Sequence, residues 1–374
     1  MRIRAVVLAT VLAAVVQSSA SAAIPRVDAR AYEVVNAATG EVLLADHART
    51  QLPMASITKL MTVLVALERT KLDDVVEVDR DAVGVTGSGV RLRAGERLTV
   101  RDLVAAAIVQ SANDAAIALA AHVAHGDEDA FVALMNRRAG ELGLRETHFE
   151  RADGLDVAGH VSTAHDLNRL AQIAMRQPVI RELALTRNTS IAGGRSLHTW
   201  NDLLGEFPGL VGVKTGHTNR AGWCQVGAAR GGGFTIYATI LGSPTRGERN
   251  ADLAELLAYG ISQYRLVPVI APQRTYAWAQ LPYGRAPVAL VADRPEKRPV
   301  RLARALVERV VAPTAIPLPV SKGQQLGEVR VYDRGKLVAS SPLVASRSVE
   351  QPGTSGKVGW YAKRTLHHLG GLFS

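Results

Sequence analysis

The chain is 374 residues long, more than one hydrophobic core usually serves, so we expect two domains. Hydrophobic residues at 47% and charged residues at 21% exclude a wholly disordered, collagen-like or disulfide-scaffold protein. The single cysteine, Cys224, excludes an intramolecular disulfide and a cysteine-rich zinc site. The formal net charge of +10 would attract an anionic partner, and its distribution along the chain indicates which one.

Residues 1–23 have the pattern of a cleaved secretory signal. Arg2 and Arg4 precede an apolar run over 5–16, and small residues follow as far as Ala23. The apolar run is well short of the ~20 residues that a membrane-spanning helix needs. We therefore predict that the protein is exported and that this segment is removed.

Residues 24–266 predict one α+β domain. The expected elements are a hairpin over 30–36 and 41–46, a helix from Ser56 to Arg69, a mainly helical stretch over 100–176, strands at 211–215, 222–229 and 234–241, and a helix over 249–265. Capping patterns at Thr99-Val-Arg-Asp102 and Thr163-Ala-His-Asp166 mark two helix starts. Because strands at both ends enclose a helical middle, we expect both ends of the domain to return to one sheet.

Residues 267–350 predict a small all-β domain, because short apolar runs alternate with nine prolines from Pro268 to Pro319. Residues 351–374 predict a linker and an amphipathic helix, in which Tyr361, Leu366 and Leu369 lie opposite Lys363 and Arg364.

Charge is divided unevenly, with a net −2 over 24–266 and +10 over 267–374. An anionic membrane surface explains both the basic C-terminal third and the apolar face of the tail. Nucleic acid explains neither the tail nor the export signal. We therefore predict a peripheral attachment to the outer face of the cytoplasmic membrane through the C-terminal helix.

Three short motifs carry groups suited to acyl transfer. Ser56-Ile-Thr-Lys59 places a hydroxyl and an amine one helical turn apart, close enough for Lys59 to take the serine proton. Ser111-Ala-Asn113 interrupts a predicted helix, and Lys214-Thr-Gly216 ends a predicted strand. Each motif alone is ordinary cap or turn chemistry, but the three together in an exported chain predict an active-site cleft.

With these motifs the chain resembles the low-molecular-mass penicillin-binding proteins that act as D-alanyl-D-alanine carboxypeptidases. The resemblance extends to Pro53–Thr62, Gln110–Ala115, Asp153-Gly-Leu-Asp156 and Gly212–Thr218, and it covers the chain from about residue 24 to its end. It implies a β-lactamase/DD-peptidase-like catalytic domain, with an antiparallel sheet and a helical subdomain, followed by an all-β domain and a membrane anchor. Ala112 departs from the glycine that many members have there.

The resemblance also implies a role for each motif residue. Ser56 is the nucleophile that attacks the penultimate D-alanine of a peptidoglycan stem peptide, and Lys59 is its base, with a pKa lowered by partial burial and by the nearby Lys214. Ser111 relays a proton to the leaving nitrogen, and Asn113 holds the substrate backbone.

The remaining implied residues bind substrate. Lys214 and Thr215 hold the terminal carboxylate, Gly216 belongs to the same binding strand, and the backbone N–H groups of Ser56 and His217 form the oxyanion hole. Arg249 is a further candidate for the carboxylate. No cofactor is implied, and the acyl-enzyme mechanism implies inhibition by β-lactams.

Other interpretations stay open at this point. The chain could be a peptidoglycan endopeptidase, which shares the chemistry, or a penicillin-binding scaffold with low turnover. A class A β-lactamase is disfavoured because no Glu-x-x-Leu-Asn segment occurs in 140–190. His122 and His125 share a helix face, but no H-E-x-x-H pattern accompanies them, so we predict no metal site.

Overall fold

The computed structural model describes residues 5–12, 23–302 and 304–370, and side chains between 23 and 362 apart from residue 303. The chain forms two compact units, the first ending at Gln263 and the second running from Tyr264 and including residues 5–12, so the boundary lies slightly before the one expected at 266/267. The reason is that the preceding helix ends at Ser262, and the strand that begins at Tyr264 pairs within the second unit.

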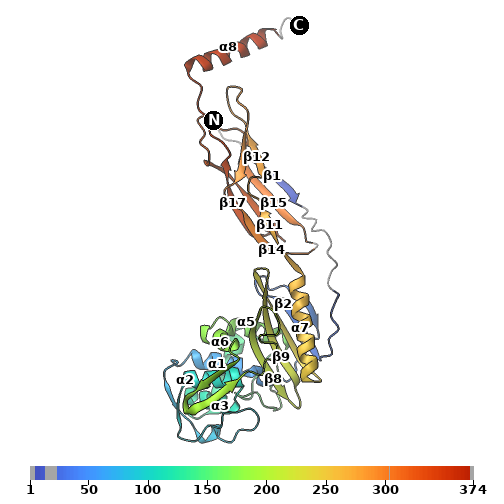
Figure 1. The fold of residues 1–374 in the computed structure, drawn as a ribbon, viewed down its shortest axis with the longest axis vertical. Coiled ribbons are helices and arrows are strands. Elements are labelled where there is room, and N and C mark those ends of the chain that lie inside the picture. The colour runs from blue at the N-terminus through green and yellow to red at the C-terminus, as the bar shows by residue number, and fades with distance from the viewer. Residues whose placement is uncertain (1–4, 13–22, 303, 371–374) are drawn as a thin grey trace. The chain divides into compact units, whose positions relative to one another are not determined.

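A five-stranded antiparallel sheet organises the first unit (Figure 1). In sheet order its strands are β3 (Val42–Asp46), β2 (Ala31–Asn36), β10 (Phe234–Ser243), β9 (Gly222–Gly231) and β8 (Leu210–Thr218). The expected return of both ends of the domain to one sheet is confirmed, since β2 pairs with β10 along most of its length.

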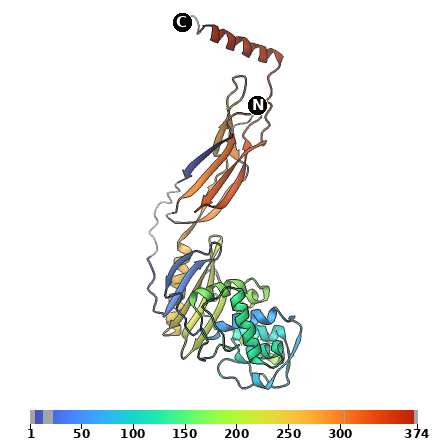
Figure 2. The same ribbon diagram turned by 180° about the vertical axis from the view of Figure 1, so that it is seen from behind.

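Helices cover both faces of this sheet (Figures 1 and 2). Helix α7 (Arg246–Ser262) packs on one face, where a Cβ at Gly260 would meet Val34 and Ile236. Helix α5 (Ala164–Ala174) packs on the other face, where the Asn168 amide donates to the Glu33 carboxylate and accepts from the Thr239 hydroxyl. Glu33 and Val34 are successive residues of β2, so their side chains point to opposite faces, and the two helices enclose the sheet between them.

A helical subdomain forms the rest of the first unit, as predicted. Its elements are α1 (Lys59–Leu67), α2 (Val100–Ala105), α3 (Asn113–Ala124), α4 (Glu128–Glu141) and α6 (Pro178–Ala184), with short hairpins β4 (Val75–Glu77)–β5 (Arg97–Thr99) and β6 (Asn188–Ile191)–β7 (Arg195–His198). The capping patterns at Thr99 and Thr163 both open helices. The expected helical stretch over 100–176 contains a non-helical segment between α4 and α5, and α6 and both hairpins were not predicted.

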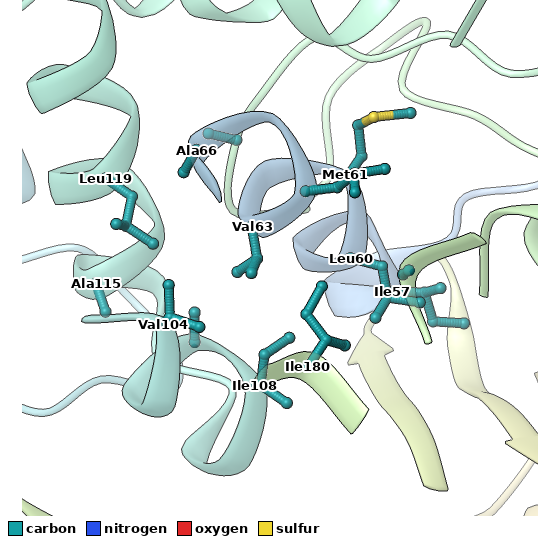
Figure 3. Close-up of a cluster of buried hydrophobic side chains, with 14 of the residues drawn as sticks. Ile57, Leu60, Met61, Val63, Ala66, Val104, Ile108, Ala115, Leu119 and Ile180 are labelled. Carbon is teal, nitrogen blue, oxygen red and sulfur yellow. The ribbon is translucent and has the colours of Figure 1, made fainter. Parts of the chain in front are cut away.

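Helix α1 is surrounded by other elements, and this burial fixes the segment that precedes it. Leu60, Val63 and Leu64 are at most 1% exposed. Figure 3 shows Val63 pointing toward Val104 and Ile108, within one buried cluster. A helix that is apolar on all sides is stable only inside a protein, so its position is determined by packing rather than by solvent.

The second unit is an all-β structure followed by a helix. A six-stranded sheet has the order β1 (Ala5–Leu12), β15 (Leu306–Pro313), β16 (Gln325–Asp333), β17 (Lys336–Ala345), β13 (Val288–Ala292) and β12 (Thr275–Ala279), with a ladder of β11 (Tyr264–Ile270) and β14 (Glu296–Arg301) beside it. The core of this unit contains Val288, Leu290, Val329 and Leu343.

The two predicted terminal segments are described only in part. Residues 5–12 of the expected signal pair with β15, and residues 1–4 and 13–22 lie outside the described residues. The tail forms helix α8 (Thr354–Gly370), while 371–374 lie outside the described residues. Among the residues that the structure describes, no helix combines the length and apolar character needed to cross a bilayer. Cleavage of the signal stays a prediction.

Candidate active site

A pocket of about 300 Å³ in the first unit brings the three motifs together. The predicted site residues on its wall are Ser56, Ser111, Asn113, Thr215, Gly216, His217 and Arg249. Lys59 and Lys214 lie directly behind this wall, bonded to Ser56 and Ser111. Segments more than 150 residues apart in the sequence therefore supply one site.

Ser56 lies in a 3-10 turn, Ala55–Thr58, and not in the α-helix that the sequence predicted to begin there. Ala55 has φ 49°, a left-handed conformation that is uncommon for a residue with a side chain. The 3-10 turn stacks residues three apart, so the side chain of Lys59 still reaches Ser56, with 2.9 Å between Nζ and Oγ. The Ser56 hydroxyl and the Lys59 amine are therefore close together, as expected, although the turn between them is a 3-10 turn rather than an α-helical one.

The contacts of the Lys59 amine define how it can act. Its Nζ lies 2.6 Å from Asn113 Oδ1 and 2.5 Å from the carbonyl oxygen of Asp153. The Asn113 amide is oriented by its other end, because Nδ2 donates to the Thr86 carbonyl. Both oxygens can only accept, so a neutral amine gives them its two N–H groups. Its lone pair is then left for the Ser56 hydroxyl.

Burial lowers the pKa of Lys59 from 10.5 to about 7. The carboxylates of Asp153 and Asp114 oppose this effect, and the Arg151 guanidinium adds to it. We expected partial burial and a contribution from Lys214 to lower this pKa, but Lys59 is completely buried and the contributing cation is Arg151. The lowered pKa depends on tertiary structure, because the fold places the loop with Arg151 and Asp153 beside the amine. In this loop the Arg151 guanidinium forms a bidentate pair with the Asp153 carboxylate.

The second motif, Ser111-Ala-Asn113, follows directly after a π-helical turn. The turn Ala106–Gln110 is π-helical, and Ser111 follows it in a left-handed conformation with φ 62°. π-Helical turns occur frequently at functional sites. This geometry puts the Ser111 hydroxyl 2.8 Å from Lys214 Nζ. The predicted interruption of the helix thus connects the second motif to the third.

Lys214 lies inside β8 rather than at its end, because the strand continues to Thr218. Its buried Nζ donates to Ser111 Oγ and to the Thr215 carbonyl oxygen, both neutral acceptors. Burial and the nearby cations Lys59 and Arg249 hold the pKa of Lys214 well below its usual range. An anion entering the pocket would therefore strongly favour the charged form of this amine.

Gly216 allows β8 to approach the turn that carries Ser56. A Cβ at this position would lie 3.0 Å from the backbone nitrogen of Ser56 and 3.0 Å from the Ala55 Cβ. β8 is also an edge strand, so one side of it has no neighbour in the described sheet. That open side can bind an extended peptide through its main chain.

An aromatic and cationic group closes the pocket beside β8. The rings of His217 and Trp223 stack with centroids 4.1 Å apart, and the Arg249 guanidinium lies 5.6 Å from the Trp223 ring. Arg249 is 1% exposed and is held by Asp202 and Asn250. Burial lowers the pKa of Arg249 to about 10, which leaves it a cation at neutral pH.

Several residues at the site were not assigned from the sequence. Asp153 and Leu155 were recognised only as part of a motif, and Trp223 and Arg246 on the pocket wall were given no role. Trp200 also lines the pocket, and it donates its Nε1–H to the Gln110 carbonyl. An aromatic side chain between two turns carries no local signal that distinguishes a pocket residue from a packing residue.

Within the described part of the chain, no group of three or more histidine, cysteine, aspartate or glutamate side chains could hold a metal ion. His122 lies in the last turn of α3, and His125 follows that helix with φ 55°. Cys224 is buried in β9, where burial raises the pKa of its thiol to about 11.

Comparison with known proteins identifies relatives for both units. Residues 17–245 match the family described as D-alanyl-D-alanine carboxypeptidase, and residues 288–351 match the C-terminal domain of penicillin-binding protein 5. The D-alanyl-D-alanine carboxypeptidase DacC of Escherichia coli is 32% identical, over 94% of this chain and 92% of its own length.

Solved structures agree with these matches. Penicillin-binding protein D2 from Listeria monocytogenes, in an ampicillin-bound form, is 34% identical with a TM-score of 0.58, covering 63% of this chain and 98% of its own. Penicillin-binding protein 5 from Haemophilus influenzae covers 88% of this chain and 99% of its own with a TM-score of 0.64, and at 24% identity it supports the fold alone.

The environment of Lys59 predicts an amine that titrates near neutrality. In the protein labelled with ¹³Cε-lysine, we expect one NMR resonance to titrate at about pH 7, because the buried amine loses its proton far below the usual lysine range. A Lys59→Met variant should lack this resonance, which assigns it. A Lys59 resonance that titrates above pH 9 would contradict this description of the site.

Proposed function

The chain belongs to the D-alanyl-D-alanine carboxypeptidase family and is a serine hydrolase of that type, and we propose that Ser56 carries the acyl-enzyme. One observation carries this assignment. The N–H groups of a neutral Lys59 are used by Asn113 Oδ1 and the Asp153 carbonyl, so its lone pair is available to the Ser56 hydroxyl. A serine paired with such an amine is an activated nucleophile.

In the proposed reaction, Ser56 Oγ attacks the carbonyl carbon of the penultimate D-alanine while its proton passes to Lys59 Nζ. The backbone N–H groups of Ser56 and His217 hold the resulting oxyanion. Collapse of this intermediate breaks the peptide bond, and Ser111 passes a proton to the departing D-alanine nitrogen. Water then hydrolyses the ester and restores the Ser56 hydroxyl.

The substrate backbone and terminal carboxylate are proposed to bind along β8. Asn113 contacts the backbone from one side, and Thr215 and Gly216 line the opposite wall. Lys214 and Thr215 bind the carboxylate, with Arg249 as a further cation beside the pocket. This assignment is supported by the neutral acceptors around Lys214, because a substrate carboxylate supplies the negative charge that they do not.

The geometry supports an enzyme more than a binding scaffold. Nucleophile, base and carboxylate-binding groups lie around one pocket, and a protein that only held peptidoglycan would have no need of a buried amine directed at a serine. A β-lactam presents a strained amide to the same hydroxyl, so we propose covalent inhibition by acylation of Ser56.

The acyl-enzyme proposal predicts the behaviour of Ser56→Ala. We expect release of D-alanine from a pentapeptide stem to fall by at least about 10⁴-fold, and covalent labelling by penicillin to disappear from the mass spectrum. Ser190→Ala, at an exposed serine outside the pocket, is the matched control and should label normally. Persistent labelling of Ser56→Ala would identify another nucleophile.

The carboxylate assignment predicts a substrate-dependent effect of Lys214→Gln. Turnover of a pentapeptide with a free C-terminus should fall about 10- to 100-fold, because a charge-assisted hydrogen bond is lost. The same peptide with a C-terminal amide should be affected much less, since it brings no charge to the site. Equal losses on the two peptides would show that Lys214 acts on the reacting carbonyl instead.

We further propose that α8 attaches the exported enzyme to the outer face of the cytoplasmic membrane. Val358 and Tyr361 on this helix are 69% and 57% exposed, so much of their surface faces outward. Trp360 and Tyr361 also contact Tyr283 of the all-β unit, with ring centroids 5.7 and 6.3 Å from that of Tyr283. Positive charge in the same unit favours an anionic surface.

The anchor predicts that removal of 354–374 releases the protein from anionic vesicles in a sedimentation assay. Full-length protein should bind, more weakly at high salt but still measurably, because apolar insertion persists when charge is screened. Turnover of a soluble pentapeptide should be unchanged, since the pocket lies in the other unit. Equal sedimentation of both proteins would exclude α8 as the attachment.

A further inference from the structure

The mechanism proposed above leaves one buried ionisable side chain beside the nucleophile turn without a role. His160 is 2% exposed and lies in the loop that follows the Asp153–Asp156 motif. Its Nε2 is 2.7 Å from Thr58 Oγ1, and its Nδ1 accepts the backbone N–H of Glu150 at 3.0 Å. Thr58 is the residue between Ile57 and Lys59, so the imidazole contacts the catalytic motif itself.

The partners of His160 define its tautomer and the direction of a hydrogen-bond chain. A backbone N–H can only donate, so Nδ1 carries no proton, and the proton of the neutral ring is on Nε2. Nε2–H therefore donates to Thr58 Oγ1, and the Thr58 hydroxyl donates in turn to the Ala55 carbonyl oxygen at 2.8 Å. Burial lowers the pKa of His160 to about 4, so the ring is neutral at neutral pH and this series of hydrogen bonds is kept.

This series of hydrogen bonds ends at Ala55, the residue that precedes the proposed nucleophile Ser56. Ala55 has φ 49°, so its peptide unit is held in a conformation that its side chain disfavours. The carbonyl of Ala55 belongs to the peptide unit that contains the backbone nitrogen of Ser56. Fixing that oxygen therefore fixes the orientation of the Ser56 N–H, one of the two proposed oxyanion donors.

The surrounding backbone leaves little other freedom. A Cβ at Gly154 would lie 2.3 Å from the Ala55 carbonyl oxygen and 2.9 Å from Thr58 Oγ1, so the motif loop packs directly on this hydrogen-bonded pair. The same loop supplies the Asp153 carbonyl to Lys59. One loop thus contacts both the base and the turn that presents the nucleophile.

We propose that His160 is a positioning residue, which acts through Thr58 and the Ala55 carbonyl to orient Ser56 for acylation. The inference rests on the assignment of Ser56 as the nucleophile. It requires the Nε2–H donor in particular, and not simply a side chain that fills the space.

Two variants separate the functions of the two ring nitrogens. His160→Gln can place an N–H near the position of Nε2 and so retain the donor to Thr58. His160→Asn can place an oxygen near Nδ1 and retain the acceptor for Glu150, but it does not reach Thr58. Both substitutions keep a polar amide in the same site.

The experiment measures acylation by a fluorescent penicillin, kcat and KM for a pentapeptide, and thermal unfolding of each folded variant. We expect His160→Asn to lower the acylation rate and kcat about 10- to 100-fold with KM within about threefold, because the reacting groups are misaligned while binding persists. His160→Gln should stay within about threefold of the unsubstituted protein. Equal losses in both variants, or losses that follow the melting temperature alone, would overturn the proposal.

A second pair tests the path through Thr58 and remains informative if a His160 variant does not fold. Thr58→Val should lose as much acylation as His160→Asn, while Thr58→Ser should retain it. The double variant His160→Asn/Thr58→Val should be no slower than Thr58→Val alone, and multiplicative losses would overturn the proposed path. Penicillin labelling of Ser56→Ala tests the nucleophile separately, so failure of that assignment is distinguishable from failure of this one.

Discussion

The turn that carries Ser56, the proposed nucleophile, is confined between two stretches of backbone, and the arrangement of the site depends on that confinement. Gly154 approaches the turn from the loop between α4 and α5, and Gly216 approaches it from β8. Neither position has room for a Cβ without displacing main-chain atoms of the turn. Ser56 is therefore positioned jointly by the helical subdomain and the sheet. Burial of α1 on all sides prevents the turn from relaxing away from either neighbour.

The two buried amines of the site have different electrostatic surroundings, and this difference separates their proposed roles. Lys59 has carboxylates nearby that oppose the effect of burial, so its pKa is lowered only to about 7. Lys214 has Lys59 and Arg249 as neighbours, which add to the effect of burial. The first amine can exchange a proton near neutrality, and the second gains most from an incoming anion. Environments that differ in this way are how one site provides both proton transfer and anion binding.

Local sequence was sufficient for the motifs and the capped helices, because each depends on residues close together in the chain. Thr99 and Thr163 illustrate this, since each cap bonds a residue three positions later. The 3-10 form of the turn at Ser56 could not be predicted, because it follows from packing against distant glycines. The continuation of β8 beyond Thr215 follows from pairing with β9. His160 lies 102 residues from Thr58, and no local pattern predicts that contact.

The complete burial of Lys59 also affects how stable the folded protein can be. An unfolded chain exposes this amine, with a pKa near 10.4, while the folded chain lowers it to about 7. Between these values the unfolded state binds more protons, so this one group makes stability increase with pH. A methionine there would fill similar space without an ionisable group and would favour folding. The lysine is thus kept against the preference of the core that surrounds it, an opposition between stability and activity located in a single side chain.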